Sequence, residues 1–212
     1  MNNPMIRNGL ILAIFAMVCT AAVAFIDKLT AERIAEQKQA QRLKVLQQII
    51  PKALHDNDLT EHCTLVYEPE ILGSEEALPA FIATTNGKPT AIALETIAPN
   101  GYNGAIKLII AVNNKNELLA VRTLNHNETP GLGDKIMLSK SDWVNFFTNK
   151  PIVEANKKSW KVKKDGGEID QFSGATITPR AYVQAVSKAS FYLRNNFDRI
   201  SRQNRACEDS NG

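Results

Sequence analysis

The sequence predicts an α+β fold in which a single N-terminal transmembrane helix is followed by one domain with a mostly antiparallel sheet and flanking helices. Three observations predict this fold. They are an uncharged apolar run near the N-terminus, two pairs of β-like runs joined by turn residues, and helical patterns that follow the strands. A doubly wound nucleotide-binding fold would need helices and strands in alternation, so this order argues against it.

The composition bounds the size of that domain and its partners. The chain has 212 residues, of which 44% are hydrophobic and 22% are charged, an ordinary balance for one folded core. Its net charge is only +3, and the basic residues are scattered along the chain rather than interleaved with aromatic ones. The composition therefore argues against nucleic-acid binding.

Residues 9–26 read GLILAIFAMVCTAAVAFI and contain no charge, which is long and apolar enough for a membrane-spanning helix. A cleaved signal peptide is the alternative, because TAAVA at Thr20 to Ala24 resembles a cleavage site. Phe25, Ile26 and a helical stretch follow directly, without the usual break. We therefore predict an uncleaved anchor preceded by a short tail, residues 1–8.

Charge alone leaves the side of the membrane open. Only Arg7 precedes the span, whereas five basic residues follow it closely: Lys28, Arg33, Lys38, Arg42 and Lys44. A positive-inside count would place the domain in the cytoplasm. Interspersed acidic residues, and the ability of large domains to translocate regardless of charge, weaken that count.

Residues 27–50 predict a helical stalk. Thr30 is a candidate N-cap, the following residues are rich in Ala, Glu, Gln, Lys and Arg, and Pro51 ends the pattern. The later part places Leu43, Leu46 and Ile50 on one face. We expect the stalk to begin exposed and to end docked on the domain.

The domain is expected over residues 51–200, with a meander of about four strands. PAFIATT and PTAIALET are joined at Asn86-Gly87, the usual dipeptide of a tight hairpin. AIKLIIAV and ELLAVRTL flank NNKN at 113–116 in the same way. Helices are predicted at SKSDWVNFFTN, with Ser139 or Ser141 as cap, and at PRAYVQAVSKASFYLRNN. Residues 201–212 resemble a frayed tail.

A glycine-rich loop, NHNETPGLGDK from Asn125 to Lys135, is one candidate site. Glycine imposes no side chain, so such a loop can bring backbone N–H groups close to a ligand. It matches neither a Walker A loop nor the Rossmann fingerprint, and a tight turn without a ligand is the alternative. His126 and Glu128 could serve as a base and its partner or as two metal ligands. No third ligand is near in sequence, so we predict no metal site.

The stretch GYNGAIKL, Gly101 to Leu108, is a second candidate. Tyr102 could stack on a flat ring, although a tyrosine in a turn before a strand more often serves packing.

The stretch DQFSGATITPR, Asp170 to Arg180, is the most informative. Pro179 fits the first turn of a helix and Thr178 suits its N-cap, which places Thr176 just outside the helix N-terminus. Unpaired N–H groups and the positive end of the dipole favour a phosphate there. Ser173, Gly174 and Ala175 leave space for a bulky group.

Asp170 could orient a hydroxyl or bind a metal brought by a modifying enzyme. A hydrolase role for Ser173 lacks both G-x-S-x-G and a nearby histidine, so no catalytic residue is predicted.

The three cysteines show no C-x-x-C spacing, which argues against zinc, haem and iron–sulfur sites. Cys19 lies in the apolar run. Cys63 and Cys207 lie in polar contexts, where they could pair in an oxidising compartment or remain free thiols.

Asp170 to Thr176, DQFSGAT, resembles the D-x-x-[ST]-G-A-[TS] motif at which a flavin transferase esterifies the phosphate of FMN onto the final threonine. With HNETPGLGDK, GYNGAIKL and one N-terminal span, essentially the whole chain resembles the G-subunit family of the Rnf (Rsx) ion-translocating electron transport complexes. The related C-subunit family of the sodium-pumping NADH:quinone reductases shares the motif but in a longer chain.

The resemblance implies that FMN is bound covalently through Thr176, in a single-pass protein of the bacterial inner membrane with its domain in the periplasm. It implies the other membrane proteins of the Rnf (Rsx) complex as partners and a flavin transferase for maturation. A periplasmic location would favour a disulfide between Cys63 and Cys207. Such a chain would carry electrons without a catalytic base of its own.

The resemblance also implies which side chains would lie near the flavin. The loop residues Glu128, Thr129, Pro130, Gly131, Leu132 and Gly133 would lie against it, with Tyr102 and the motif residues Asp170, Ser173, Gly174 and Ala175. From their placement in the sequence rather than from the resemblance, Lys135, Lys163 or Lys164 could offset the charge of the phosphate or of the reduced flavin; surface lysines without a ligand are the alternative.

Two other functions remain open from the residues. One is a membrane-anchored binding or scaffolding module without a cofactor, in which SGAT is only a turn of small residues. The other is a self-standing flavin reductase that oxidises NADH directly, for which the sequence offers no recognisable nicotinamide site.

Overall fold

The computed structural model describes residues 4–203, and these begin with one long helix, α1 (Pro4–Ile49). Within it, Pro4–Ala31 is apolar enough to cross a membrane and buries no residue inside the protein. The prediction that Thr30 caps a separate stalk helix is wrong, because its hydroxyl donates to the Ile26 carbonyl inside α1 at 2.9 Å. Residues 10–50 contain neither glycine nor proline, so nothing in the sequence breaks the helix there.

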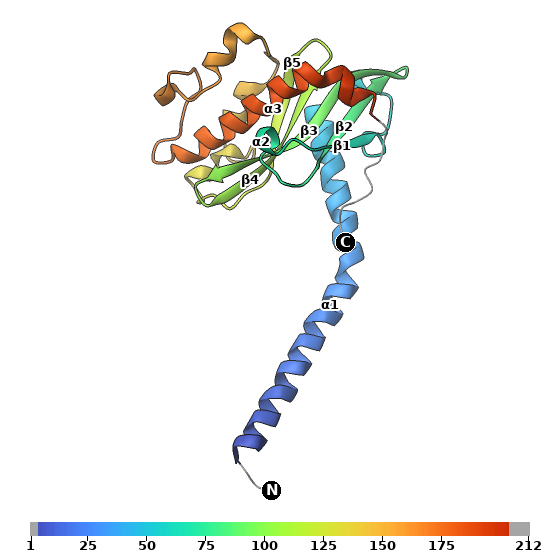
Figure 1. The fold of residues 1–212 in the computed structure, drawn as a ribbon, viewed down its shortest axis with the longest axis vertical. Helices are drawn as coiled ribbons and strands as arrows, with labels where there is room; N and C mark the ends of the chain where they lie inside the picture. The colour runs from blue at the N-terminus through green and yellow to red at the C-terminus, as the bar shows by residue number, and fades with distance from the viewer. Residues whose placement is uncertain (1–3, 204–212) are drawn as a thin grey trace. The chain divides into compact units, whose positions relative to one another are not determined.

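Residues 45–203 form a compact unit separate from residues 4–44. Its centre is a six-stranded antiparallel sheet in sequential order (Figure 1). The strands are β1 (Cys63–Val66), β2 (Leu78–Thr85), β3 (Lys88–Gly101), β4 (Gly104–Asn113), β5 (Glu117–Asn125) and β6 (Lys150–Pro151). The predicted four-strand meander is confirmed as β2 to β5. Strands β1 and β6 are not among the predicted strands, because they are short edge strands with little periodic pattern.

The β3–β4 turn and the loop after β5 lie at one end of this sheet, and the β2–β3 hairpin lies at the other. Asn86 and Gly87 have φ angles of 52° and 73°, as a two-residue type I′ hairpin requires. At the other end of β3, a turn through Tyr102 and Asn103 leads into β4. Lys107 of β4 pairs with Asn125 of β5. That turn therefore lies at the same end of the sheet as the loop that follows β5.

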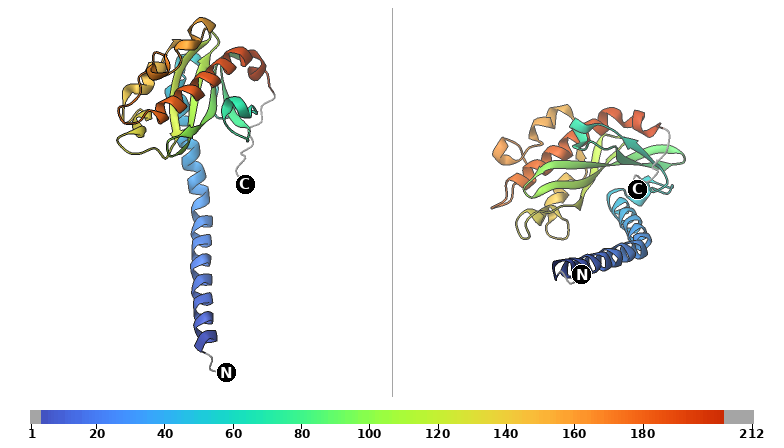
Figure 2. Two further views of the ribbon diagram at one scale, coloured as in Figure 1. Left: turned by 60° about the vertical axis from the view of Figure 1, so that its left-hand side comes forward. Right: turned by 60° about the horizontal axis from the view of Figure 1, so that its bottom comes forward.

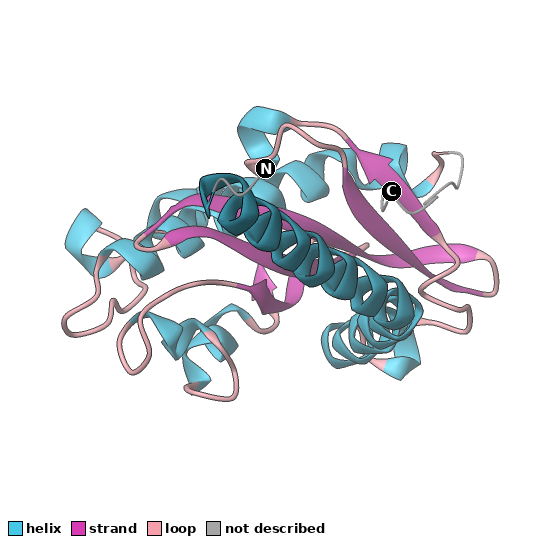
Figure 3. Ribbon diagram, turned by 90° about the horizontal axis from the view of Figure 1, so that it is seen from below, coloured by secondary structure: helices cyan, strands magenta, loops and turns pink. Residues whose placement is uncertain are grey.

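Both faces of the sheet are covered. Helix α3 (Ile177–Ser201) runs along one face, as the views of Figure 2 show, and Figure 3 distinguishes the strands from the helices and loops. Its buried side chains join a core with inward residues of the strands: Ile92, Leu94, Leu108 and Ile110. The strand residues that point to the other face include Phe81, Ala91, Ala93 and Ile109. They pack with Leu46 and Ile49 at the end of α1 and with Ile50, which follows the helix. Because both faces are buried, the strands read as nearly continuous apolar runs rather than as alternating ones.

Short helical turns connect the other elements. They are η1 (Lys52–Leu54), α2 (Pro69–Leu72), η2 (Gly133–Ile136), η3 (Asp142–Phe147), η4 (Glu154–Ser159) and η5 (Lys163–Asp165). The helix predicted at SKSDWVNFFTN is the 3₁₀ helix η3, and of the two candidate caps it uses Ser141, whose Oγ accepts from the Trp143 N–H at 3.2 Å.

Helix α3 begins earlier than predicted. Its N-cap is Thr176, and Thr178 is its second residue. The assignment of Thr178 as the cap is wrong because its hydroxyl is buried and donates to the Glu128 carboxylate instead. The proline that suggested the start, Pro179, is the third helical residue.

Candidate functional site

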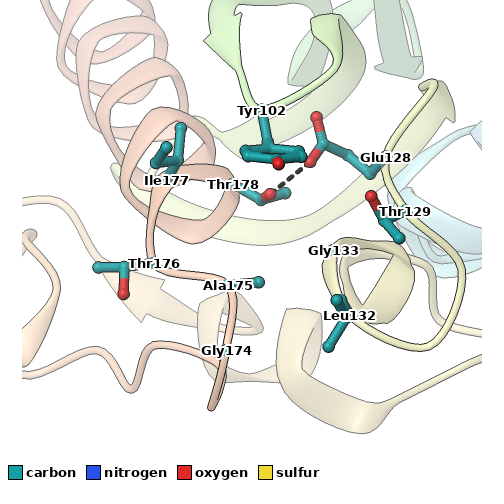
Figure 4. Close-up of a pocket in the computed structure, with 10 residues that line it drawn as sticks. All are labelled: Tyr102, Glu128, Thr129, Leu132, Gly133, Gly174, Ala175, Thr176, Ile177 and Thr178. Atoms are coloured by element: carbon teal, nitrogen blue, oxygen red, sulfur yellow. Dashed lines mark hydrogen bonds between the residues drawn. The ribbon is translucent and has the colours of Figure 1, made fainter.

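Three segments from distant parts of the sequence meet around a cavity of about 250 Å³ (Figure 4). They are the β3–β4 turn, the loop between β5 and η2, and the DQFSGAT stretch with the first turn of α3. In Figure 4, Thr176 lies on one side of the view, and Thr129 and Leu132 of the β5–η2 loop lie on the opposite side. The lining residues are Tyr102, Glu128, Thr129, Leu132, Gly133, Gly174, Ala175, Thr176, Ile177 and Thr178.

Glu128 joins the three segments. Its Oε2 accepts a hydrogen bond from the Thr178 hydroxyl, which ties the loop to α3. Its Oε1 accepts from the backbone N–H of Asn103 at 3.2 Å, which ties the loop to the β3–β4 turn. The side chain is only 4% exposed, so these bonds satisfy a carboxylate that would otherwise be costly to bury. His126 supports the loop through its Nδ1, 3.0 Å from the Glu128 backbone nitrogen. Both candidate metal ligands are thus engaged in holding the loop.

Two glycines permit this close approach. A Cβ on Gly133 would lie 2.7 Å from Glu128 Oε2 and 2.9 Å from Thr178 Oγ1. A Cβ on Gly101 would lie 2.7 Å from Glu128 Oε1. Any side chain at either position would push the carboxylate out of place, so the backbone itself forms the wall of the site.

The DQFSGAT stretch makes a tight turn. The Ala175 N–H donates to the Phe172 carbonyl at 3.2 Å, and Gly174 supplies the left-handed conformation with φ 81°. Phe172 is buried edge-on against the Trp143 ring, with centroids 5.0 Å apart. The Trp143 indole N–H also donates to the Asp170 carbonyl at 2.7 Å. Helix η3 therefore holds this turn at two points.

Thr176 leaves the turn as the N-cap of α3, half-buried and with a hydroxyl that makes no capping hydrogen bond. The first N–H groups of a helix have no intrahelical acceptor, and this end of the helix carries partial positive charge. Thr176 lines the cavity, so the N-terminus of α3 makes that part of the lining favourable for an anionic group.

Arg180, in the first turn of α3, is engaged elsewhere. Its guanidinium donates to both carboxylate oxygens of Asp165 at 2.6 and 2.8 Å. These hydrogen bonds lower the pKa of Asp165 and raise the pKa of Arg180.

The predicted site residues divide into two groups. Eight of them line the cavity: Tyr102, Glu128, Thr129, Leu132, Gly133, Gly174, Ala175 and Thr176. Pro130, Gly131, Asp170 and Ser173 do not line it and lie exposed. Asp170 instead pairs with Lys163, with Oδ1 and Nζ 2.6 Å apart.

The cations expected to offset ligand charge do not line the cavity either. Lys163 is paired with Asp170, and neither Lys135 nor Lys164 is among the lining residues. The lining therefore contains none of these lysines, and its favourable group for an anion is the positive N-terminal end of α3. Of the expected disulfide pair, Cys63 is buried at the start of β1 and Cys207 lies outside the described residues, so the pairing remains a prediction.

Two lining residues, Ile177 and Thr178, are not among the predicted site residues. The helix-start pattern predicts Thr178 only as a cap. A buried glutamate fifty positions away in sequence leaves no local signal that could have identified the pair.

The arrangement suits a flat aromatic ligand that carries an anionic group. Tyr102, Leu132 and Ile177 offer partly exposed apolar surface, at 66%, 42% and 48% exposure. The polar end lies at Thr176. A ligand with a hydrophobic ring system and a phosphate would match both ends.

Comparisons with known proteins indicate which family this chain resembles. Residues 1–49 match the family described as RnfG N-terminal region, and residues 101–190 match the FMN-binding domain family. The second match includes all three segments of the site.

Similar proteins cover the whole chain. The G subunit of an ion-translocating oxidoreductase complex from Shewanella oneidensis is 55% identical over 208 residues, which is 98% of each chain. The G subunit from Shewanella baltica is 54% identical with the same coverage. That of Vibrio parahaemolyticus is 52% identical over 97% of each chain. Among solved structures, Shewanella oneidensis NqrC aligns with 73% of this chain and 75% of its own, at 18% identity and a TM-score of 0.47.

Proposed function

This chain belongs to the G-subunit family of ion-translocating oxidoreductase complexes, and we propose that it carries FMN as a phosphoester on Thr176 and relays electrons within such a complex. Membership of this family makes the chain a flavoprotein subunit of an ion-translocating oxidoreductase. Its FMN-binding domain favours this function over a scaffold without a cofactor.

One observation carries the finer proposal. The DQFSGAT turn presents Thr176 at the edge of the cavity and at the N-terminus of α3, with its hydroxyl uncommitted to capping. A flavin transferase would supply the phosphoryl group from a flavin dinucleotide: a bond forms between Thr176 Oγ1 and the FMN phosphorus, the phosphoanhydride bond breaks, and the hydroxyl proton and a nucleoside monophosphate leave. The remaining negative charge would then lie beside unpaired helix amides, an arrangement that stabilises an anion by about 0.3–1 kcal/mol.

The lining residues fit the rest of the cofactor. Gly133 and Gly174 remove side chains where the backbone forms the wall. Leu132, Ile177 and Tyr102 offer apolar surface for a ring system, and Glu128 holds the three segments together. When bound, FMN supplies one- and two-electron redox chemistry. The protein would position the ring and leave part of it open to partners, because a cavity of about 250 Å³ is small for such a ligand.

The location and the maturation partners belong to the same proposal. Pro4–Ala31 would anchor the chain in the bacterial inner membrane, with the domain in the periplasm beside the other subunits. A flavin transferase would attach the FMN there, and Cys63 and Cys207 would form a disulfide in that oxidising compartment. The family supports the partnership with other subunits.

Flavin fluorescence in a denaturing gel tests the attachment. Full-length chain produced together with a flavin transferase should give a fluorescent band that survives unfolding, because only a covalent flavin stays with the polypeptide. Thr176→Ser should keep the band, since it retains a hydroxyl at the same position, whereas Thr176→Ala should lose it. A fluorescent Thr176→Ala band, or a dark wild-type band, would refute the assignment.

A further inference from the structure

Six of the chain's sixteen lysines lie within residues 150–165. This segment contains six lysines and two acidic residues, a net charge of +4 that exceeds the +3 of the entire chain. The remaining residues therefore sum to −1. A surface this uneven attracts charged partners even though the protein as a whole is nearly neutral.

Internal ion pairs neutralise only part of this segment. Lys150, Lys157 and Lys163 approach acidic side chains at 3.9, 3.8 and 2.6 Å. Lys158, Lys161 and Lys164 are exposed and form no ion pair within 4 Å in the described part of the chain. Lys161 and Lys164 act on Asp165 only from a longer range, where they help to lower its pKa. Three neighbouring positive charges are thus available to an external acid.

The segment borders a groove beside the proposed flavin site. A hollow of about 390 Å³ lies between it and α3, and its lining includes Lys157, Lys161, Val162, Arg180, Val183 and Lys188. Arg180 pairs with Asp165, and Lys188 Nζ donates to the Glu70 carbonyl at 2.9 Å, which leaves Lys157 and Lys161 as the other cations of the lining. Arg180 follows Thr176 by one turn of α3, and its backbone N–H donates to the Thr176 carbonyl at 3.3 Å. A protein docked in the groove would therefore approach within about a helical turn of the flavin attachment residue.

We infer that this lysine-rich surface, residues 150–165 with Arg180 and Lys188, docks an acidic segment of another protein of the same complex. The inference rests on the proposed function for its purpose, which is to bring a redox partner next to Thr176. Complexes between redox proteins often bury a small interface and are steered by charge. A groove of this size with lysines in its lining is therefore sufficient for such a partner to dock.

The residues favour an acidic protein over a lipid surface. The patch includes Glu154 and Asp165 among its lysines, and Asp165 lines the groove itself. Such interspersed acids oppose binding to a uniformly anionic membrane, whereas an acidic segment with its own basic residues can match them. The mixed apolar and charged lining is also typical of protein interfaces.

Lysine footprinting tests the inference on the full-length chain. Acetic anhydride labels accessible lysines, and mass spectrometry then reports the labelling rate of each one. The labelling would be compared in three samples: the chain alone in nanodiscs of neutral lipid, the chain alone in nanodiscs with anionic lipid, and the assembled complex. Lys52, Lys88 and Lys115 are exposed on other elements and serve as controls.

If an acidic protein docks at this surface, Lys158, Lys161 and Lys164 should label about tenfold more slowly in the assembled complex than in either sample of the chain alone. High salt should weaken this protection, and the control lysines should stay within about twofold. Equal labelling in all three samples, or protection by anionic lipid alone, would overturn the inference. The measurement needs no flavin, so a missing flavin on Thr176 would refute the proposed function without affecting this result.

A charge-reversal variant adds a functional test. Combined Lys158→Glu, Lys161→Glu and Lys164→Glu should slow flavin reduction in the assembled complex by about tenfold while the covalent flavin band remains. The matched variant, Lys52→Glu with Lys88→Glu and Lys115→Glu, changes the net charge equally and should reduce normally. Equal rates for both variants would contradict docking at this surface.

Discussion

At the scale of single residues, the site depends on the buried carboxylate of Glu128, which takes no part in the proposed flavin attachment. Glu128 is 4% exposed, and its two oxygens bond to different segments, the Thr178 hydroxyl and the Asn103 amide. Its role is to hold the walls of the cavity in register. The Thr178 hydroxyl can therefore be tested separately from the attachment residue two positions earlier.

Thr178→Val should destabilise the domain by about 1–3 kcal/mol, because it leaves Glu128 Oε2 buried without its hydroxyl donor. Thermal unfolding of the full-length chain in detergent measures this. Thr178→Ser keeps the hydroxyl and should lose much less stability. If both variants unfold at the wild-type temperature, the Glu128–Thr178 bond does not hold the site together.

Tyr182 should make the domain sensitive to alkali. Complete burial raises the pKa of its phenol above the ordinary value of 10.0. Below that pH the phenol is protonated in both states. Above it the unfolded state loses the proton while the folded state retains it, so stability falls as pH rises. Unfolding temperatures between pH 8 and pH 11 report this slope.

Tyr182→Phe should flatten most of the alkaline slope, since the buried ionisable group is gone. Tyr192→Phe is the matched control, because burial also raises the pKa of Tyr192 but that side chain is closer to the surface. A slope unchanged by Tyr182→Phe would show that another group controls alkaline unfolding.

At the scale of elements, η3 resembles an ordinary helix in the sequence but functions as the support of the DQFSGAT turn. Trp143 donates to the Asp170 carbonyl at 2.7 Å and packs edge-on against Phe172 and Tyr182. The turn that presents Thr176 is therefore held by a residue almost thirty positions away.

Trp143→Phe should slow flavin attachment by up to about tenfold, because it removes one hydrogen bond worth about 0.5–1.5 kcal/mol from the turn. The covalent flavin band measured over time after induction of the flavin transferase gives the rate. Trp160→Phe is the matched control, since the Trp160 indole nitrogen has no hydrogen-bond partner in the described chain. Equal rates for the two variants would remove Trp143 from this role.

The elements that could be predicted from the sequence are those with strong local signals. The hairpin at Asn86-Gly87 follows from a dipeptide that tolerates positive φ, and α3 follows from its apolar period. The two-residue strand β6 has no such period. The Thr30 cap fails because a good capping residue inside a strong helix simply bonds to its own backbone.

The site divides in the same way. The loop and the DQFSGAT motif could be predicted because glycines and small residues mark them. The Glu128–Thr178 bond and the Trp143 support could not, because both depend on tertiary contacts between segments far apart in sequence.

At the scale of the whole molecule, the proposed function requires the domain to lie in the periplasm, which the charges around the span do not determine. Alkaline phosphatase fused to the C-terminus should therefore be active, because that enzyme folds only outside the cytoplasm, where its disulfides form. A cytoplasmic fluorescent reporter at the same position should stay dark. The opposite pattern would place the domain in the cytoplasm and remove the basis for the Cys63 to Cys207 disulfide.

The central claim is the phosphoester on Thr176, and intact mass measures it most directly. Full-length chain produced with its flavin transferase should exceed the polypeptide mass by FMN less one water, and chain produced without the transferase should not. Fragmentation should place the added mass on Thr176, and Thr176→Ala should abolish it. A bare polypeptide mass in the presence of the transferase, or an adduct on another residue, would contradict the phosphoester on Thr176.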